Sequence, residues 1–343
     1  MLAGLISDNP SPCYWLPNTH GMTTPTFFTL VIHAHSGAAA LAKVLLSAVG
    51  QGYEPFEILL TGSGDIGPYA SVVAKLGWPI TCLFASEFTQ LDAARNAAAA
   101  EAKGEWIWFL DDQDELETHA LQRLSAMVPS ADAQTGFIWL SENLGPLGEN
   151  TAPNSPPKPD HSPMALLNDT LRLGALSGLV IQKTAFQRAG AFAAEYVQGS
   201  ELELFIRCLA LGIEAHMHPS AGVFKRGPLP GPLAVAQHHS EAKTYEQLFT
   251  KHGTYLNHNF DLYIDLLFGC AKGHYAAHNF YSADKIVTII LRFWRRRPLK
   301  MYFLTRELKR LKMEALEQRR QVVPGVTFAC RRRPRQKSDA GHA

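Results

Sequence analysis

The chain has 343 residues, of which 46% are hydrophobic and 18% charged, a balance that is typical of folded proteins and argues against a disordered chain. Its five cysteines are scattered singly, which argues against a disulfide framework and against a structural zinc site. No stretch reaches the roughly 18 to 20 apolar residues of a membrane-spanning helix, and no basic segment precedes the first apolar run. We therefore expect a cytoplasmic protein without a transmembrane anchor.

Charge is distributed unevenly along the chain. The formal net charge is only +1, yet 16 Lys and Arg stand against 4 Asp and Glu from Arg292 onward. The C-terminal segment is therefore strongly basic, and the rest of the chain is acidic.

Apolar runs alternate with helical stretches in the first half of the chain. The patterns predict strands at residues 28–33, 56–61, 80–84 and 106–110, with helices at 37–49, 70–76 and 91–103 between them. Gly104 follows the last of these helices and is expected to end it. This alternation is typical of a layered α/β domain with a largely parallel sheet.

The second half begins with further short elements and becomes helical. We expect strands at 136–140, 178–182 and 215–219, a helix at 201–211, and a mobile loop at the proline-rich residues 145–163. Later helices are predicted at 245–267, 281–294 and 299–320. The predicted organisation is a flexible extension (1–25), an α/β domain (26–233), a helical region (234–322) and a basic tail (323–343).

Polar groups follow three of the predicted strands, at residues 33–36, 62–65 and 111–115. Ligands of doubly wound sheets bind at the carboxyl ends of the strands. The sequence DDQDE at 111–115 is the most informative of the three, because adjacent carboxylates repel one another unless a cation offsets them. A Mn²⁺ or Mg²⁺ diphosphate site would do so. The alternative is the N-terminus of a helix that starts near Glu115, with Asp112 and Asp114 interacting with its dipole.

The order of these features resembles that of family 2 glycosyltransferases over residues 27 to 230. FTLVIHAHS and FEILLTGSGD are similar to the first two nucleotide-binding strands and their turns. LDAARNAAAAEAKGEWIWFLDDQDEL is similar to the family's run of helix, glycine, strand and acidic cluster. SGLVIQKTAFQRAGAFAAEYVQGSELELFIRCLALG resembles the part that shapes the acceptor side.

The resemblance implies an α/β GT-A fold, Rossmann-like with a mostly parallel sheet flanked by helices, and a C-terminal helical extension. It also implies an inverting hexosyl transfer from a nucleotide-diphosphate sugar to the hydroxyl of a saccharide or lipid-linked acceptor. Synthesis of surface polysaccharide or glycolipid would use such a reaction.

The resemblance further implies which residues form the site. Glu201 stands where the family places the base, although it could instead be a structural carboxylate in the first turn of a helix. Glu203 is the reserve candidate and should face another side of that helix. The metal ligands are expected to be Asp111 and Asp114. The expected contacts of the nucleotide sugar are His33, His35, Ser36, Ser63, Asp65, Arg95, Asp111 and Asp112. Arg95 could instead form a structural ion pair.

Two positions depart from the family pattern. Gly62 and Ser63 replace an acidic pair in the second turn, and Gln113 replaces the central aspartate of the metal motif. A neutral amide is a poorer ligand than a carboxylate for a hard cation. A second hypothesis is therefore a catalytically inactive GT-A scaffold that binds a sugar or a protein.

His33 and His35 stand at i and i+2 at a strand end and point the same way, which would suit a metal. With no further Cys or Asp evident beside them in the sequence, we favour hydrogen bonding to a ligand or to the loop.

The predicted final helix carries one apolar stripe, formed by Met301, Leu304, Leu308, Leu311 and Ala315. Together with the surrounding arginines, the stripe has two interpretations. Residues 292–335 could lie on the anionic inner face of the cell membrane, or the helix could pack and leave a solvated basic face. No nucleic-acid-binding module accompanies the charge, so a nucleic-acid partner is not expected.

Overall fold

A computed structural model of the chain describes residues 25–86, 88, 90–128, 135–140, 143–144, 179–196, 199–218, 223–225 and 235–322. The predicted loop at 145–163 and the tail at 323–343 lie outside these residues, as does the predicted N-terminal extension except for its last residue.

Seven strands form the main sheet, in the order β3-β2-β1-β4-β8-β6-β9. Their bounds are β1 Phe28–His33, β2 Phe56–Ser63, β3 Ile80–Ala85, β4 Trp106–Asp111, β6 Thr135–Leu140, β8 Leu179–Gln182 and β9 Glu214–His218. Strands β1 to β4 are parallel, whereas β8 runs antiparallel to both of its neighbours. The predicted α/β architecture with a mostly parallel sheet is confirmed.

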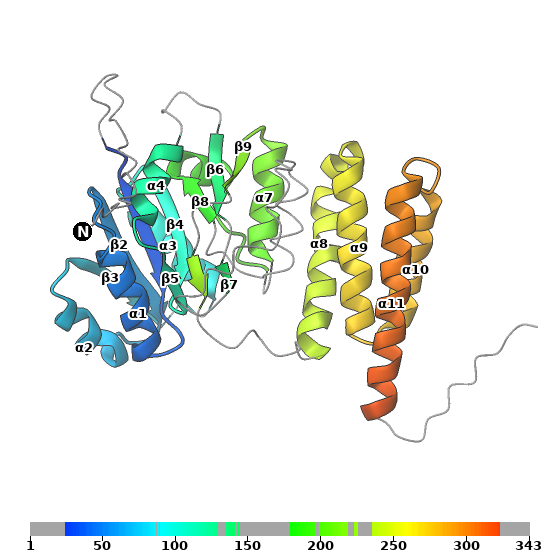
Figure 1. The fold of residues 1–343 in the computed structure, drawn as a ribbon, viewed down its shortest axis with the longest axis horizontal. Coiled ribbons are helices and arrows are strands. Elements are labelled where there is room, and N and C mark those ends of the chain that lie inside the picture. Colours follow the sequence, from blue (N-terminus) through cyan, green and yellow to red (C-terminus); the bar gives the residue numbers. More distant parts are fainter. Residues whose placement is uncertain are drawn as a thin grey trace, which may run out of the picture.

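Helices cover both faces of this sheet (Figure 1). Their bounds are α1 Ala38–Val49, α2 Gly67–Leu76, α3 Leu91–Glu101, α4 Ala120–Met127, α6 Lys183–Arg188 and α7 Ser200–Ala210. One apolar core joins the sheet to α1, α2 and α4, and a second joins it to α3, α6 and α7. A second, three-stranded sheet has the order β5-β10-β7, with β5 at Asp114–Leu116, β10 at Val223–Lys225 and β7 at Asn143–Leu144.

Gly104 has a different role from the one predicted. Helix α3 ends at Glu101, two residues earlier than expected, and its C-cap is Ala102. A Cβ on Gly104 would lie 2.6 Å from the backbone nitrogen of Thr29 and 2.8 Å from the carbonyl oxygen of Phe27. The glycine is therefore needed because the backbones of this segment and of β1 approach closely.

Four long helices stand side by side next to the sheet, with α10 and α11 furthest from it (Figure 1). They are α8 Val235–His258, α9 Phe260–Ala276, α10 Phe280–Arg292 and α11 Pro298–Val322. The predicted single helix at 245–267 is wrong, since α8 ends at His258 and Asn259 is the N-cap of α9. None of the helices described is long and apolar enough to cross a membrane.

The apolar stripe of the final helix is mostly an internal surface. Met301, Leu308 and Ala315 are buried in a core with side chains of α9 and α10, and Leu304 and Leu311 pack against that core. The packed-helix interpretation is therefore correct for the stripe. Contact between the stripe and a membrane, which the sequence left open, is ruled out because other helices already cover it.

Candidate functional site

The site is built where the winding of the sheet changes direction. Strands β2 and β3 follow β1 on one side, and β4 pairs with β1 on the other, so that His33 lies opposite Asp111. Ligands bind at the carboxyl ends of strands at such a point, because loops diverge there and leave a crevice. The loops after β1 and β4 therefore bring the residues at 33–36 and 111–115 together, as predicted.

Asp112 joins these two loops. Its Oδ2 accepts hydrogen bonds from the backbone N–H groups of His35 at 2.7 Å and Ser36 at 2.6 Å. The carboxylate is buried, so these charge-assisted hydrogen bonds replace the water that it would otherwise hold. Gln113 adds a third link, since its side-chain amide donates to Ser36 Oγ at 2.6 Å. Asp112 thus fixes the shape of the loop after β1.

His35, Asp111 and Asp112 form a group that could hold a cation. The Nδ1 atom of His35 lies 3.6 Å from Asp111 Oδ1 and 3.4 Å from Asp112 Oδ1. One ligand atom from each residue can be chosen so that all lie within 4.8 Å of one another. Burial raises the pKa of Asp111, and the adjacent Asp112 adds to this rise, whereas His35 opposes it. A divalent cation would relieve the repulsion between the two carboxylates.

The candidate cation group differs from the expected ligand pair, Asp111 and Asp114. His35 has two carboxylate neighbours that its position in the sequence did not reveal, so a metal role becomes a candidate for His35 beside the expected hydrogen bonding. Asp114 is buried outside this group, and its Oδ2 accepts a hydrogen bond from the Asp111 N–H at 2.6 Å.

The helix interpretation of the acidic cluster is wrong. Residues Asp114–Leu116 form strand β5, which pairs antiparallel with β10, and α4 begins only at Ala120. Asp112 and Asp114 therefore do not stand in the first turn of a helix.

Arg95 lies between the acidic cluster and the candidate base. It is buried on α3, and its Nη1 lies 3.7 Å from Glu201 Oε1 and 3.7 Å from Asp92 Oδ1. Burial lowers the pKa of Arg95, and four carboxylates oppose that effect: Glu201, Asp92, Asp111 and Asp114. Among the described residues, its Nε and Nη1 atoms form no hydrogen bond. Nη1 therefore interacts with the carboxylates of Asp92 and Glu201 at ion-pair distance only.

Glu203, the reserve candidate for the base, belongs to a structural cluster. Its carboxylate is buried and lies 2.6 Å from Arg207 Nη2, 2.9 Å from His252 Nε2 and 3.1 Å from Lys251 Nζ. Burial alone would raise the pKa of Glu203, but the hydrogen bonds from these neighbours lower it to about 2. A carboxylate held this strongly is a poor proton acceptor. Sequence reasoning missed the partners on α8, since no local pattern links α7 to residues so far along the chain.

His33 is neutral near pH 7. It is buried, and burial together with the positive charge of Arg95 lowers its pKa to about 4. Its ring stacks on that of His35, with ring centroids 5.7 Å apart. Ser63 and Asp65, by contrast, lie exposed where β2 ends, in the turn expected to meet the nucleotide.

Gly62 has no room for the acidic side chain found in the family. A Cβ at this position would lie 2.5 Å from Phe84 Cε1 and 3.0 Å from the Ala34 carbonyl oxygen. We expect Gly62→Ala to lower the free energy of unfolding by about 1 to 3 kcal/mol through overpacking. Urea denaturation measures this, and Gly253→Ala is the control, since nothing lies within 4 Å of its added Cβ. An equally stable Gly62→Ala variant would show that the ring of Phe84 moves aside freely.

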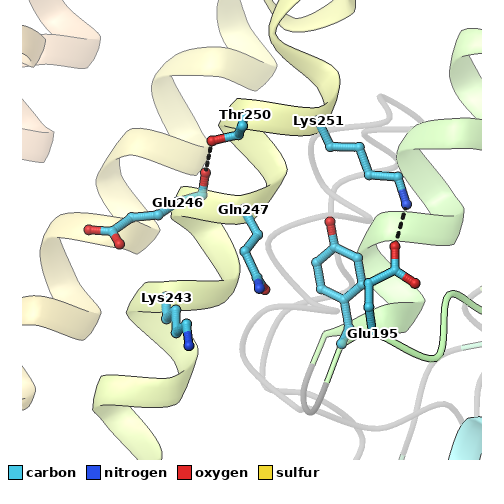
Figure 2. A pocket seen from close by; sticks show the side chains of 7 residues that line it. Glu195, Lys243, Glu246, Gln247, Thr250 and Lys251 are labelled. Atoms are coloured by element: carbon cyan, nitrogen blue, oxygen red, sulfur yellow. Dashed lines mark hydrogen bonds and ion pairs between the residues drawn. The ribbon is translucent and has the colours of Figure 1, made fainter.

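Pockets in the described part of the chain include one beside the acidic cluster and one beside α8. One, of about 260 Å³, adjoins the acidic cluster and is lined by Ser36, Ala40, Lys43, Asp112, Gln113 and Asp114. The other, of about 360 Å³, lies between α8 and the segment before α7 (Figure 2). Lys251 there pairs with Glu195 at 2.8 Å, and the cation cluster described above contributes no residue to it. The pocket at the carboxyl ends of β1 and β4 is therefore the better candidate for binding the nucleotide-sugar donor.

The comparisons with known proteins agree with this fold. Residues 29–139 match the model of glycosyl transferase family 2. The chain is similar to S. aureus TarS 1-349 in complex with UDP-GlcNAc, with 12% identity and a TM-score of 0.52, over 86% of this chain and 92% of that chain. It is also similar to the mannosyltransferase PcManGT from Pyrobaculum calidifontis in complex with GDP-Man and Mn²⁺, with 14% identity and a TM-score of 0.52, over 87% of this chain and 88% of that chain.

The curated proteins include no sequence match to this chain. Identities this low carry information on the fold alone, whereas the match over residues 29–139 concerns the sequence itself. Residues 29–139 therefore resemble glycosyl transferase family 2 in sequence, and the chain has the GT-A fold.

Proposed function

We propose that the protein transfers a hexose from a nucleotide-diphosphate sugar to an acceptor hydroxyl with inversion, and that Glu201 is the base. One observation carries this proposal. Buried Arg95 pairs with Glu201 at 3.7 Å, and the charges of Asp111 and Asp114 also act on it, so the candidate base and the acidic cluster are neighbours of the same guanidinium group. A single displacement needs both: a proton acceptor on one side of the anomeric carbon and a charged site for the diphosphate on the other.

His35, Asp111 and Asp112 would hold the Mn²⁺ or Mg²⁺ ion. Their donor set fits such an ion, because two carboxylates and one imidazole converge within 4.8 Å. When bound, the ion would stabilise the negative charge that develops on the departing diphosphate. This set exchanges Asp114 of the predicted pair for His35 and Asp112.

The residues of the chain perform the remaining steps. Glu201 takes the proton of the acceptor hydroxyl. At the same time the acceptor's hydroxyl oxygen bonds to the anomeric carbon, and the bond from that carbon to the diphosphate breaks. Arg95 donates from its buried guanidinium to the sugar or phosphate oxygens and holds Glu201 in place. His33, Ser36, Ser63 and Asp65 line the path expected for the nucleotide.

The acceptor is proposed to be a saccharide or a lipid-linked saccharide, as in surface polysaccharide or glycolipid synthesis. The structural neighbours are described with UDP-GlcNAc in one case and GDP-Man in the other, so uridine and guanosine donors both occur on this fold. The compact turn at Gly62 replaces the acidic pair of the family. Recognition of the donor's nucleobase therefore falls on Ser63 and Asp65.

A catalytically inactive scaffold is the second candidate. Gln113 favours it, because this neutral side chain stands in the metal motif and is hydrogen-bonded to Ser36. Such a scaffold would bind a nucleotide sugar without consuming it, which separates the two candidates experimentally.

The nucleotide site can be tested by thermal unfolding with UDP, GDP and dTDP, each with and without Mn²⁺. We expect one nucleotide to raise the Tm in the presence of Mn²⁺, since a ligand at about 100 times its Kd stabilises the folded state by about 2.7 kcal/mol. Asp111→Asn should remove most of this shift, and the control Glu101→Gln at the exposed C-terminal end of α3 should keep it. A Tm that none of the three nucleotides changes, with or without Mn²⁺, would refute the site.

A further inference from the structure

The turn between α10 and α11 presents large apolar side chains to solvent. Their exposed fractions are 75% for Leu299, 62% for Phe303, 51% for Tyr302, 46% for Leu291 and 40% for Trp294. Leu299, Tyr302 and Phe303 stand at i, i+3 and i+4 and so share one face of α11. Leu291 and Trp294 flank the end of α10. We call these five residues the corner patch.

The corner patch is separate from the internal stripe of α11. Met301, on the same helical turn as Leu299, Tyr302 and Phe303, is fully buried. Exposure of the patch therefore leaves the core of the helical region intact. Large aromatic and aliphatic side chains at one exposed corner mark an interaction surface.

Positive charge surrounds the corner patch. Residues 291–310 contain eight Lys and Arg and a single acidic residue, Glu307. Arg297 and Lys300 are paired with acidic residues of α9, at 3.2 Å to Asp261 and 2.9 Å to Asp265. In the part of the chain that the structure describes, no ion pair involves Arg292, Arg295 or Arg306, and all of them are exposed. These arginines are available to an anionic partner.

The corner is held firmly. The ring of Phe293, between Leu291 and Trp294, packs edge-on against Phe260 at 5.1 Å and Tyr263 at 6.1 Å. The ion pairs of Arg297 and Lys300 fix the start of α11 to α9. The patch is therefore displayed on a preformed corner, which reduces the entropy lost on binding.

We propose that the corner patch and its arginines dock on an anionic lipid bilayer. The side chains match the chemistry of a membrane interface: Trp294 and Tyr302 suit the headgroup level, Leu299 and Phe303 the acyl boundary, and arginines the lipid phosphates. A second copy of the chain would bring like charges together, and a nucleic acid would leave the leucines without an apolar partner. The corner lies far from the sheet, so docking there leaves the candidate site uncovered (Figure 1).

Vesicle flotation of the full chain tests this proposal. We expect binding to phosphatidylcholine vesicles that contain phosphatidylglycerol and much weaker binding to pure phosphatidylcholine. Each Lys or Arg near an anionic surface contributes about 1 kcal/mol, so Arg292→Glu with Arg295→Glu should lower the partition coefficient at least tenfold. Leu299→Ser with Phe303→Ser should do the same, since these residues are exposed and their loss leaves the fold intact.

The matched control is Leu46→Ser on α1 with Lys75→Glu on α2, which changes one exposed leucine and one exposed cation outside the corner patch. This variant should bind the vesicles as the unchanged chain does. Three results would overturn the proposal. The first is no binding to anionic vesicles. The second is binding that is reduced by Arg331→Glu, Arg332→Glu and Arg333→Glu in the tail but not by the changes in the corner patch. The third is a dimer that dissociates on Leu299→Ser with Phe303→Ser. The last result would assign the patch to a contact between copies of the chain.

Discussion

Glu201→Gln is expected to bind a nucleotide sugar with unchanged affinity and to lower kcat about 10²- to 10⁴-fold. The amide keeps the size of the side chain and can still contact Arg95, which lies 3.7 Å from the carboxylate, but it cannot accept the proton of the acceptor. The magnitude is that of a lost general base. Rates of sugar transfer and calorimetric affinities for the donor, measured on the same preparation, separate the two effects.

The control for this variant is Glu101→Gln, an exposed carboxylate in the last turn of α3, which should retain full activity. Retained turnover in Glu201→Gln would assign Glu201 the structural role left open by its position in the first turn of α7. A parallel loss of donor affinity and activity would instead show that the residue organises the donor site with Arg95.

Glu203→Gln is expected to lower the free energy of unfolding by about 3 kcal/mol at neutral pH. Removing one charge from a buried ion pair leaves its partners uncompensated, and such changes cost about 3 to 5 kcal/mol. The partners here are Arg207, His252 and Lys251. Urea unfolding at pH 7 measures the difference, and Glu101→Gln at the exposed C-terminal end of α3 is the control with a small effect.

The pH dependence of this effect has a defined sign. The pKa of Glu203 falls from 4.5 to about 2 on folding, so its contribution is fully present above pH 4.5. It should be lost as the pH falls from 4.5 towards 2, by up to about 3 kcal/mol. The unchanged chain should therefore lose more stability than Glu203→Gln over this range. Parallel pH profiles of the two proteins would contradict the ion-pair assignment.

Local patterns predicted most of the α/β elements. Buried strands such as Trp106–Asp111 are continuous apolar runs followed by polar turns, and their alternation with helices fixes the class of fold. The break at Asn259 was missed because apolar residues continue on both sides of it and a helix stop there has no strong local mark. The role of Gly104 was misassigned because a glycine just after a helix is the usual mark of a helix end. The close approach of the distant backbone of β1, which also requires a glycine, leaves the same mark in the sequence.

The candidate site was predicted in part. The topology of a doubly wound sheet places the ligand site at the carboxyl ends of the central strands, so the meeting of residues 33–36 with 111–115 could be expected. The pairing of His35 with two carboxylates depends on how the loop after β1 folds around Asp112, and no spacing in the sequence reports this. The cluster around Glu203 depends likewise on the docking of α8 against α7. The domain boundary expected at 233/234 stays a prediction.

Transfer of radiolabelled sugar from UDP-, GDP- and dTDP-sugars, with a cell-envelope extract as the source of acceptor, tests the central claim most directly. We predict Mn²⁺-stimulated incorporation from one donor class that Glu201→Gln and Asp111→Asn both abolish. A donor that binds but is neither transferred nor hydrolysed, under any of these conditions, would contradict the claim and identify the protein as a nucleotide-sugar-binding scaffold.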